Sequence, residues 1–193
     1  KMYGFKQSVS SSGEALVVHY SPDNIWVLFN TVYNSNVGII STGSTNYFVI
    51  GNVIYNISDA AIKFRGTDDA NILGNTVHSA FIGLEIESSA NNAHVVNNII
   101  TDILDTVNGY HILRAGSIAE ISNNILYQTG GSVRNSGVSA GYIEVDPQFV
   151  NPSARNYHLQ ATSPAIDTGT GSGAVQQVLN SFQSRYGLGI SYD

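Results

Sequence analysis

Two stretches of the sequence decide the fold: VIGNVIYN at residues 49–56 and ILGNTVHS at residues 72–79. They superpose without gaps on Asn52 and Asn75, with apolar residues before and after each asparagine. Three further stretches follow the same pattern, VLFNTVYN (27–34), VVNNIITD (95–102) and ISNNILYQ (121–128). A repeat of this kind predicts identical structural units that stack on one another.

The asparagine of each copy defines the period. These asparagines are Asn30, Asn52, Asn75, Asn98 and Asn124, and their separations are 22, 23, 23 and 26 residues. Apolar residues recur three positions before each asparagine and two positions after it. The first set is Val27, Val49, Ile72, Val95 and Ile121, and the second is Val32, Ile54, Val77, Ile100 and Leu126.

Each period contains about three short segments rich in β-branched and aliphatic residues, separated by Asn, Gly, Ser and Asp. Helical spacing of apolar residues is missing from these segments. Such a period fits one coil of a parallel β-helix, whose coils hydrogen-bond to one another about 4.8 Å apart. The equivalent asparagines then stack at one turn, each amide bonding to the next. We therefore predict an all-β parallel β-helix, a solenoid of about five to six coils.

Composition agrees with this fold and excludes several functions. Only 11% of the residues are charged, against roughly 25% in an ordinary soluble chain. In a solenoid a repeated charge would lie about 4.8 Å from its own copy and repel it. The net charge of −6 argues against nucleic acid and anionic membrane surfaces as partners. No apolar run is long enough for membrane insertion, and the absence of cysteine excludes a disulfide framework.

With these repeats the chain resembles the right-handed parallel β-helix superfamily, which includes pectate and alginate lyases, glycoside hydrolases, epimerases and phage tailspikes. Residues 145–169, VDPQFVNPSARNYHLQATSPAIDTG, are similar to the closing segment of many secreted bacterial members. The resemblance implies a right-handed solenoid, an extracellular or cell-surface location, and a polysaccharide or other glycan as partner. Family members usually continue beyond this segment, so we expect a portion of a longer chain, with further coils upstream.

We expect three segments, which are coils at 1–150, a closing loop segment at 151–173, and a C-terminal helix and tail at 174–193. The helix is predicted over 174–186, because the apolar residues of AVQQVLNSFQSRY fall on one helical face. We expect this helix to cap the last coil. Strand edges exposed at the coil ends would favour self-association.

Five charged or titratable residues are predicted to share one exposed sheet: Lys63, Arg65, Glu85, Glu87 and His111. This follows from strand alternation, with the apolar neighbours of these residues facing inward. Two interpretations are open. Opposite charges on adjacent coils can simply pair, contributing under about 1 kcal/mol per pair. Alternatively, this sheet is the floor of a saccharide groove, as in the enzymes that the chain resembles.

The resemblance to lyases implies a base and a cation for β-elimination from a uronic acid. Lys63 or His111 could remove the proton α to the carboxylate, and Arg65 could hold the carboxylate as charge develops. Four acidic residues could supply oxygen ligands to calcium: Glu85, Glu87, Asp68 and Asp69. A hydrolase would instead use Glu85 and Glu87, whose backbones lie roughly 6.5 to 7 Å apart on one strand.

A second predicted exposed row stands three residues after the repeat asparagines. Its members are Tyr33, Tyr55, His78, Thr101 and Tyr127, of which the aromatic residues are candidate substrate-binding residues. Aligned aromatic side chains can stack on sugar rings, or they can stabilise the sheet through cross-strand pairs. The sequence therefore favours an extracellular polysaccharide lyase. A β-helix glycoside hydrolase and a non-catalytic glycan-binding protein, such as an adhesin or tailspike segment, are the alternatives.

Overall fold

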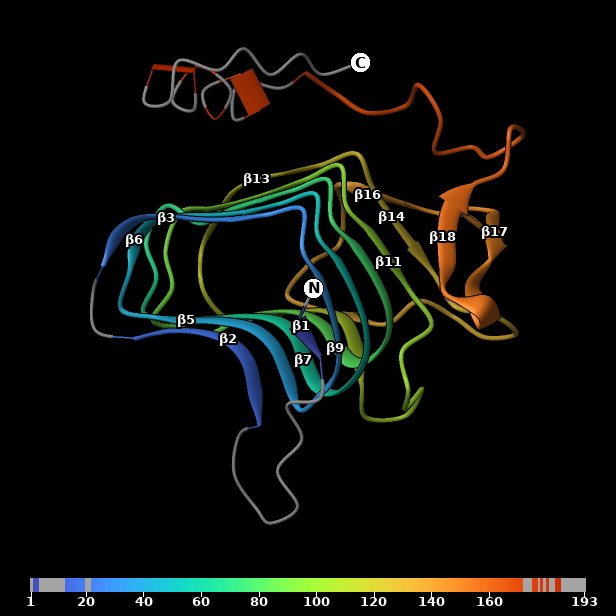
Figure 1. Ribbon diagram of the computed structural model, residues 1–193, viewed down its shortest axis with the longest axis horizontal. Coiled ribbons are helices and arrows are strands. Elements are labelled where there is room, and N and C mark those ends of the chain that lie inside the picture. The colour runs from blue at the N-terminus through green and yellow to red at the C-terminus, as the bar shows by residue number, and fades with distance from the viewer. Residues whose placement is uncertain are drawn as a thin grey trace.

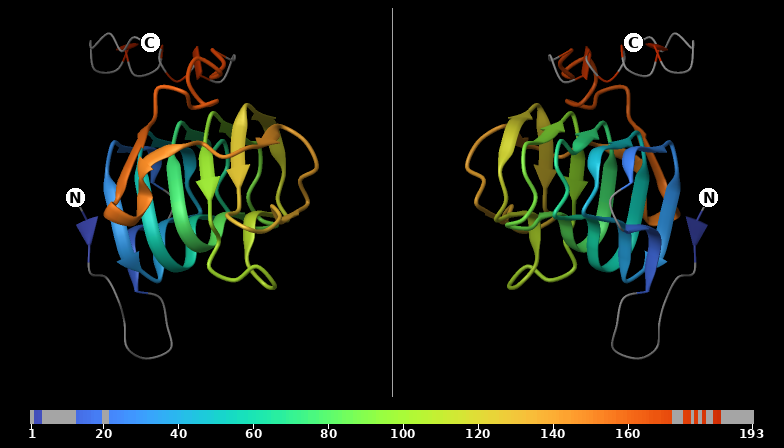
Figure 2. Two further views of the ribbon diagram at one scale, coloured as in Figure 1. Left: turned by 90° about the vertical axis from the view of Figure 1, so that its right-hand side faces the viewer. Right: turned by 90° about the vertical axis from the view of Figure 1, so that its left-hand side faces the viewer.

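A computed structural model describes residues 2–3, 13–19, 22–171, 175, 176, 178, 180, 183 and 184. The main body is a parallel β-solenoid of about five turns, seen along its axis in Figure 1 and from its sides in Figure 2. The predicted all-β parallel solenoid is confirmed. Each coil contributes strands to three faces.

The first face is a five-stranded parallel sheet. Its strands, in spatial order, are β13 (Ile118–Ser122), β10 (Ala93–Val96), β8 (Asn71–Leu73), β6 (Thr45–Ile50) and β3 (Asp23–Leu28). The other two faces belong to one eleven-stranded sheet. The sheet is continuous because β7 (Val53–Arg65) and β9 (Thr76–Ile86) run through the corner between these faces.

The second face contains the first halves of β7 and β9. The other strands of this face are β1 (Met2–Tyr3), β4 (Thr31–Ser35), β11 (Ile99–Thr101), β14 (Asn124–Tyr127) and β16 (Tyr142–Glu144). The third face contains the second halves of β7 and β9. It is completed by β2 (Glu14–His19), β5 (Val37–Thr42), β12 (Tyr110–Arg114) and β15 (Asn135–Ser136).

An asparagine ladder runs along the corner between the first and second faces. The Oδ1 of Asn75 accepts hydrogen bonds from the backbone N–H and Nδ2 of Asn52, each at 3.0 Å. Asn75 in turn donates in the same way to Oδ1 of Asn98, which donates to Asn124. Asn52, Asn75, Asn98 and Asn124 are buried. The predicted stacking of the repeat asparagines is confirmed.

The two apolar columns beside the ladder form the core of the solenoid. Val49 pairs with Val27 and Ile72, and Ile54 pairs with Val32 and Val77. These residues are at most 3% exposed. The inward positions of the third face, Ile62 and Leu84 among them, complete the same core. Register along the solenoid is therefore fixed on all three faces.

The closing segment forms a β-hairpin where the sequence predicted only a loop. Strands β17 (Phe149–Asn151) and β18 (Asn156–Leu159) are antiparallel, joined by the 3-10 helix η1 (Pro152–Ala154). The hairpin lies outside the second face (Figure 1). Beyond it, the backbone of Thr170 exchanges two hydrogen bonds with the Asn97 side chain. The S-P-A-I-D-x-G motif thus leads the chain back across the asparagine corner.

The predicted C-terminal helix is only partly within the described residues. Of 174–186, residues 175, 176, 178, 180, 183 and 184 are described and helical. Val175 and Val178 pack against Phe48, Leu73 and Val96, on the outer face of the five-stranded sheet (Figure 1). The described part therefore lies along the side of the solenoid, and a cap over its end is not shown. Among the described residues, no helix is long and apolar enough to cross a membrane.

Substitutions in the middle and at the edge of the ladder should differ in how much they lower the free energy of unfolding. Asn75→Ala should lower the free energy of unfolding by about 3 kcal/mol, because it leaves buried donors of Asn52 without an acceptor. Asn30→Ala should cost about 1 kcal/mol, because Asn30 is half-buried and only donates from its side chain. Urea denaturation would measure both values. Equal losses would contradict the ladder as the main support of the corner.

Candidate functional site

The charged residues of the third face form an ion-pair ladder. Lys63 Nζ lies 2.7 Å from Glu85 and 3.3 Å from Glu87. The guanidinium of Arg65 makes two hydrogen bonds of 2.8 Å to the carboxylate of Glu87. The predicted alignment of Lys63 with Glu85 is confirmed. All four charges therefore have partners within the sheet.

These pairs hold the charged forms in place. Burial opposes the charge of Lys63, but the contacts with Glu85, Asp59 and Glu87 outweigh it and raise the pKa of Lys63. The hydrogen bond from Arg65, with help from Lys63, lowers the pKa of Glu87. Lys63 stays protonated at neutral pH and Glu87 stays ionised. In this arrangement Lys63 has no free electron pair with which to accept a proton, and Glu87 has no proton to donate.

His111 does not lie on the exposed sheet, which corrects the sequence prediction. Its side chain is completely buried. Leu113, rather than His111, is paired with Glu85, and His111 falls at the position of Gly83 in the preceding coil. The Nε2 of His111 lies 2.9 Å from the carbonyl oxygen of Tyr127, and Nδ1 accepts from the N–H of Arg134. Both ring nitrogens are thus bound to backbone, as in a neutral structural histidine.

A column of small residues in the sequence indicates that the position of His111 is buried. The positions equivalent to His111 in the earlier coils are Gly38, Ala61 and Gly83, all small and buried. A column of small residues marks a tight corner, because an added Cβ at Gly83 would approach the His111 carbonyl oxygen to 2.6 Å. Strand alternation alone predicts an outward side chain here and takes no account of the corner.

The four acidic residues proposed as calcium ligands are not gathered into one site. Glu85 and Glu87 belong to the ion-pair ladder, whereas Asp68 and Asp69 are hydrogen-bonded to Asn91 and Asn92 of the next coil. Across the described part of the chain, no group of three or more histidine, cysteine or acidic side chains could hold a metal ion. A calcium site in these four residues therefore has no support in the geometry.

The aromatic row of the second face is aligned as predicted but is not an open surface. Tyr33, Tyr55 and His78 pair in register, followed by Thr101 and Tyr127. Tyr55 is 7% exposed and Thr101 is 1% exposed. The hairpin covers this row, and the Tyr157 ring packs on Tyr55 and His78 at 5.4 and 5.3 Å between ring centroids. The expectation of an exposed row is therefore wrong for its central members.

Stacking within the row also limits what its rings can bind. The Tyr33 and Tyr55 rings are parallel to within 2°, with centroids 4.9 Å apart. Equivalent aromatic residues in adjacent coils are held near the strand spacing of about 4.8 Å, so they stack on each other. The face that each ring turns toward the other is closed to a sugar. The hydroxyl groups and ring edges remain as the parts that can contact a ligand.

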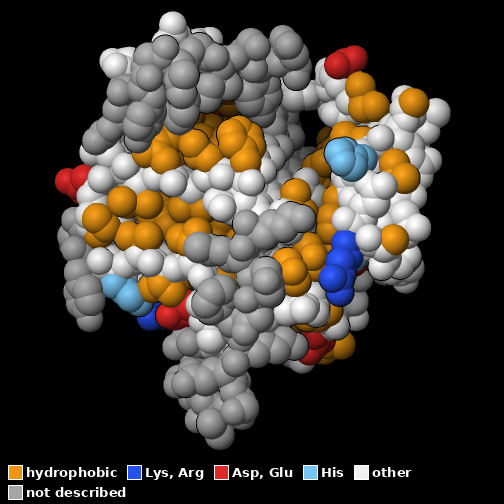
Figure 3. Space-filling model, in the orientation of Figure 1, with side chains coloured by type: hydrophobic (Ala, Val, Ile, Leu, Met, Phe, Trp, Pro, Cys, Tyr) orange, Lys and Arg blue, Asp and Glu red, His pale blue; other side chains and the backbone are white. Residues whose placement is uncertain are grey.

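A cleft of about 650 Å³ lies where the hairpin meets the second face; we call it the Arg155 cleft. Its lining residues are Thr31, Tyr33, Val53, Tyr55, Arg155, Asn156, Tyr157 and His158. The Arg155 guanidinium carbon lies 5.8 and 5.7 Å from the Tyr33 and Tyr55 ring centroids, in cation–π geometry. The lining contains no Asp or Glu. Figure 3 shows basic side chains beside the hairpin at this position.

The hydroxyls of Tyr55 and Tyr157 in the Arg155 cleft can donate hydrogen bonds. Burial raises the pKa of Tyr55 and raises that of Tyr157 to about 12. Both groups therefore stay protonated over the physiological range. The repeat identifies Tyr33 and Tyr55 as candidates. It does not identify Arg155 and Tyr157, because they belong to the non-repeating segment.

Local sequence explains how Arg155 reaches this place. Asn151 caps η1 by accepting the N–H of Ala154, and Pro152 supplies the fixed backbone angle of the first helical turn. Arg155 then ends the turn in the left-handed region, with φ 62°, and its N–H donates to Pro152. The N-P-S-A-R sequence is thus a turn signal that presents the arginine at the tip of the hairpin.

The buried histidines predict how stability depends on pH. Burial lowers the pKa of His111 and His78 below the ordinary value of 6.5, so the unfolded chain binds more protons than the folded chain just below that pH. The free energy of unfolding should therefore fall as the pH drops from about 6.5 toward 5. His111→Asn should reduce this slope, and His78 should contribute a further part of it. Urea titrations at several pH values would test this, and an unchanged slope in His111→Asn would contradict it.

Comparison with known proteins agrees with the observed architecture. A family model described as "Right handed beta helix region" matches residues 5–126, more than half of the chain. No match was found among curated proteins or among solved structures. The matched range contains the repeat asparagines, the apolar columns and strands β2 to β13, which build most of the three faces. The chain belongs to the right-handed β-helix family.

Proposed function

We propose that this protein binds a carboxylate-bearing polysaccharide in the Arg155 cleft, outside the cell or at its surface. One observation carries the proposal: a guanidinium is held over two stacked tyrosines in a cleft lined by no carboxylate. A guanidinium offers two parallel donors that fit a carboxylate. The Tyr55 and Tyr157 hydroxyls add neutral donors for sugar hydroxyl groups. The extracellular location rests on the family resemblance of the closing segment.

Binding without cleavage fits the geometry better than elimination or hydrolysis does. The residues considered as bases are Lys63, which is held protonated by its ion pairs, and His111, which is buried and bound to backbone at both nitrogens. A hydrolase acid would need a raised pKa, and Glu87 has a lowered one. The proposal therefore keeps the polysaccharide partner and favours the binding function over the lyase.

The acidic character of the whole chain does not prevent such binding. The net charge of −6 repels a polyanion at long range, but salt screens this repulsion beyond about 8 Å at physiological ionic strength. Within the Arg155 cleft the nearest fixed charge is the guanidinium itself. Affinity should consequently be modest and should decrease as salt is added, because a single cation–carboxylate contact supplies much of the electrostatic attraction.

Removing the arginine charge should weaken binding. Arg155→Gln keeps a long polar side chain at the same backbone position. It should reduce affinity for oligogalacturonate or oligoalginate about tenfold or more, because a charge-assisted hydrogen bond is lost. Isothermal titration calorimetry of wild type and variant would measure the change. Unchanged affinity in Arg155→Gln would overturn the site.

Lys63→Ala is the matched control, because it removes a cation from the ion-pair ladder on a different face. It should leave affinity unchanged. The same polymers incubated with wild-type protein should gain no absorbance from an unsaturated product. A gain that disappears in Lys63→Ala would instead establish the lyase, with the catalytic groove on the third face.

A further inference from the structure

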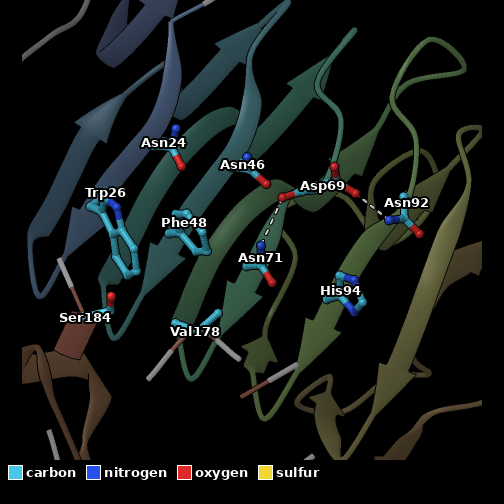
Figure 4. A pocket seen from close by; sticks show the side chains of 10 residues that line it. All are labelled: Asn24, Trp26, Asn46, Phe48, Asp69, Asn71, Asn92, His94, Val178 and Ser184. Carbon is cyan, nitrogen blue, oxygen red and sulfur yellow. Dashed lines mark hydrogen bonds between the residues drawn. The ribbon is translucent and has the colours of Figure 1, made fainter. Parts of the chain in front are cut away.

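A second cleft, of about 580 Å³, lies on the outer face of the five-stranded sheet (Figure 4). We call it the Trp26 cleft. Its lining residues are Asn24, Trp26, Asn46, Phe48, Asp69, Asn71, Asn92, His94, Val178 and Ser184. The Trp26 and Phe48 rings stack with centroids 3.9 Å apart and, together with Val178, form its apolar wall. This cleft and the Arg155 cleft share no lining residue.

The side chains that line the Trp26 cleft form two rows that run from coil to coil along the solenoid. Asn24, Asn46, Asp69 and Asn92 occupy the first row, each with a left-handed backbone of φ between 54° and 59°. Asn71 and His94 continue the row begun by Trp26 and Phe48. Figure 4 shows the two rows side by side, with Val178 and Ser184 next to the row of Trp26 and Phe48. A ligand lying along the solenoid axis would meet an equivalent side chain in every coil.

Several polar groups of this cleft have no hydrogen-bond partner within the described part of the chain. Asn92 bonds to Asp69, and the Asn71 amide donates to the Asp69 carbonyl oxygen. The half-buried side chains of Asn24 and Asn46, by contrast, make no hydrogen bond to any described residue. The Nδ1 of His94 is buried without a hydrogen-bond partner there, 3.7 Å from a carboxylate oxygen of Glu120. Buried polar atoms are normally hydrogen-bonded, so the unpartnered Nδ1 of His94 points to a ligand, and the amides of Asn24 and Asn46 are available to bind it.

The charges select the class of ligand. The lining contains no lysine or arginine, and its one carboxylate, on Asp69, is already bonded by Asn92. A polyuronate carboxylate would therefore have no lysine or arginine to pair with here and would be repelled by Asp69. Each free amide offers both a donor and an acceptor, which matches neighbouring hydroxyl groups of a sugar, and the aromatic wall can pack on the apolar C–H groups of the ring. We propose that the Trp26 cleft binds an uncharged oligosaccharide.

The chain provides its own probe for this site. Trp26 is the single tryptophan of the sequence, so tryptophan fluorescence reports on this cleft alone. Titration with cellohexaose, laminarihexaose, mannohexaose and maltohexaose should give a saturable change with at least one of them. Oligogalacturonate should give none. If no neutral hexasaccharide changes the fluorescence up to millimolar concentrations, or if oligogalacturonate changes it more strongly, the proposal is wrong.

A glycine substitution tests the role of the Asn46 amide without straining the backbone. Asn46→Gly removes the amide but keeps a residue that adopts positive φ without strain, and it should weaken binding about tenfold. Asn56→Gly is the matched control, because Asn56 also has a positive φ, of 55°, and lies outside both clefts. It should bind like wild type. Equal affinity of Asn46→Gly and wild type would overturn the assignment of the amide row.

Discussion

The side-chain amide of asparagine supports the whole structure. It carries an acceptor and a donor on one short side chain, so the same residue can bond to the coil on either side. In this protein Asn52, Asn75 and Asn98 each accept two hydrogen bonds from the coil before and donate to the coil after. The preceding residues, such as Gly51 and Gly74, take the left-handed turn that brings the asparagine inward. Coil-to-coil register follows from this corner.

Fixed register decides how the solenoid surface behaves. Every outward side chain lies beside the side chain at the equivalent position of the next coil. Opposite charges at such positions therefore pair, and aromatic rings stack. Lys63 is neutralised by Glu85, and Tyr33 is stacked on Tyr55. Rows that look in the sequence like catalytic or sugar-binding surfaces are thus satisfied by the fold itself. A regular ladder stabilises the solenoid and leaves few groups free for a ligand.

The two clefts arise where non-repeating chain meets the regular surface. The hairpin β17–β18 brings Arg155 over the second face, and the C-terminal segment brings Val178 and Ser184 over the first. Their charges differ, because one lining has a cation and no carboxylate and the other has a carboxylate and no lysine or arginine. This difference is the reason that we propose an acidic saccharide for one cleft and an uncharged saccharide for the other. The irregular parts of the chain therefore supply the features that distinguish one site from the other.

The sequence by itself determined the coils, the asparagine ladder and the inward columns, because a short repeat encodes contacts between neighbouring copies. Ile54 beside Val77 and Lys63 beside Glu85 follow directly from the period. Only the tertiary structure decided that His111 is buried at a corner, that Tyr157 covers Tyr55, and that Arg155 faces a cleft. These placements depend on segments far apart in the sequence that occur once. Periodicity carries no information about where such segments pack, because their position is set by shape and burial in three dimensions.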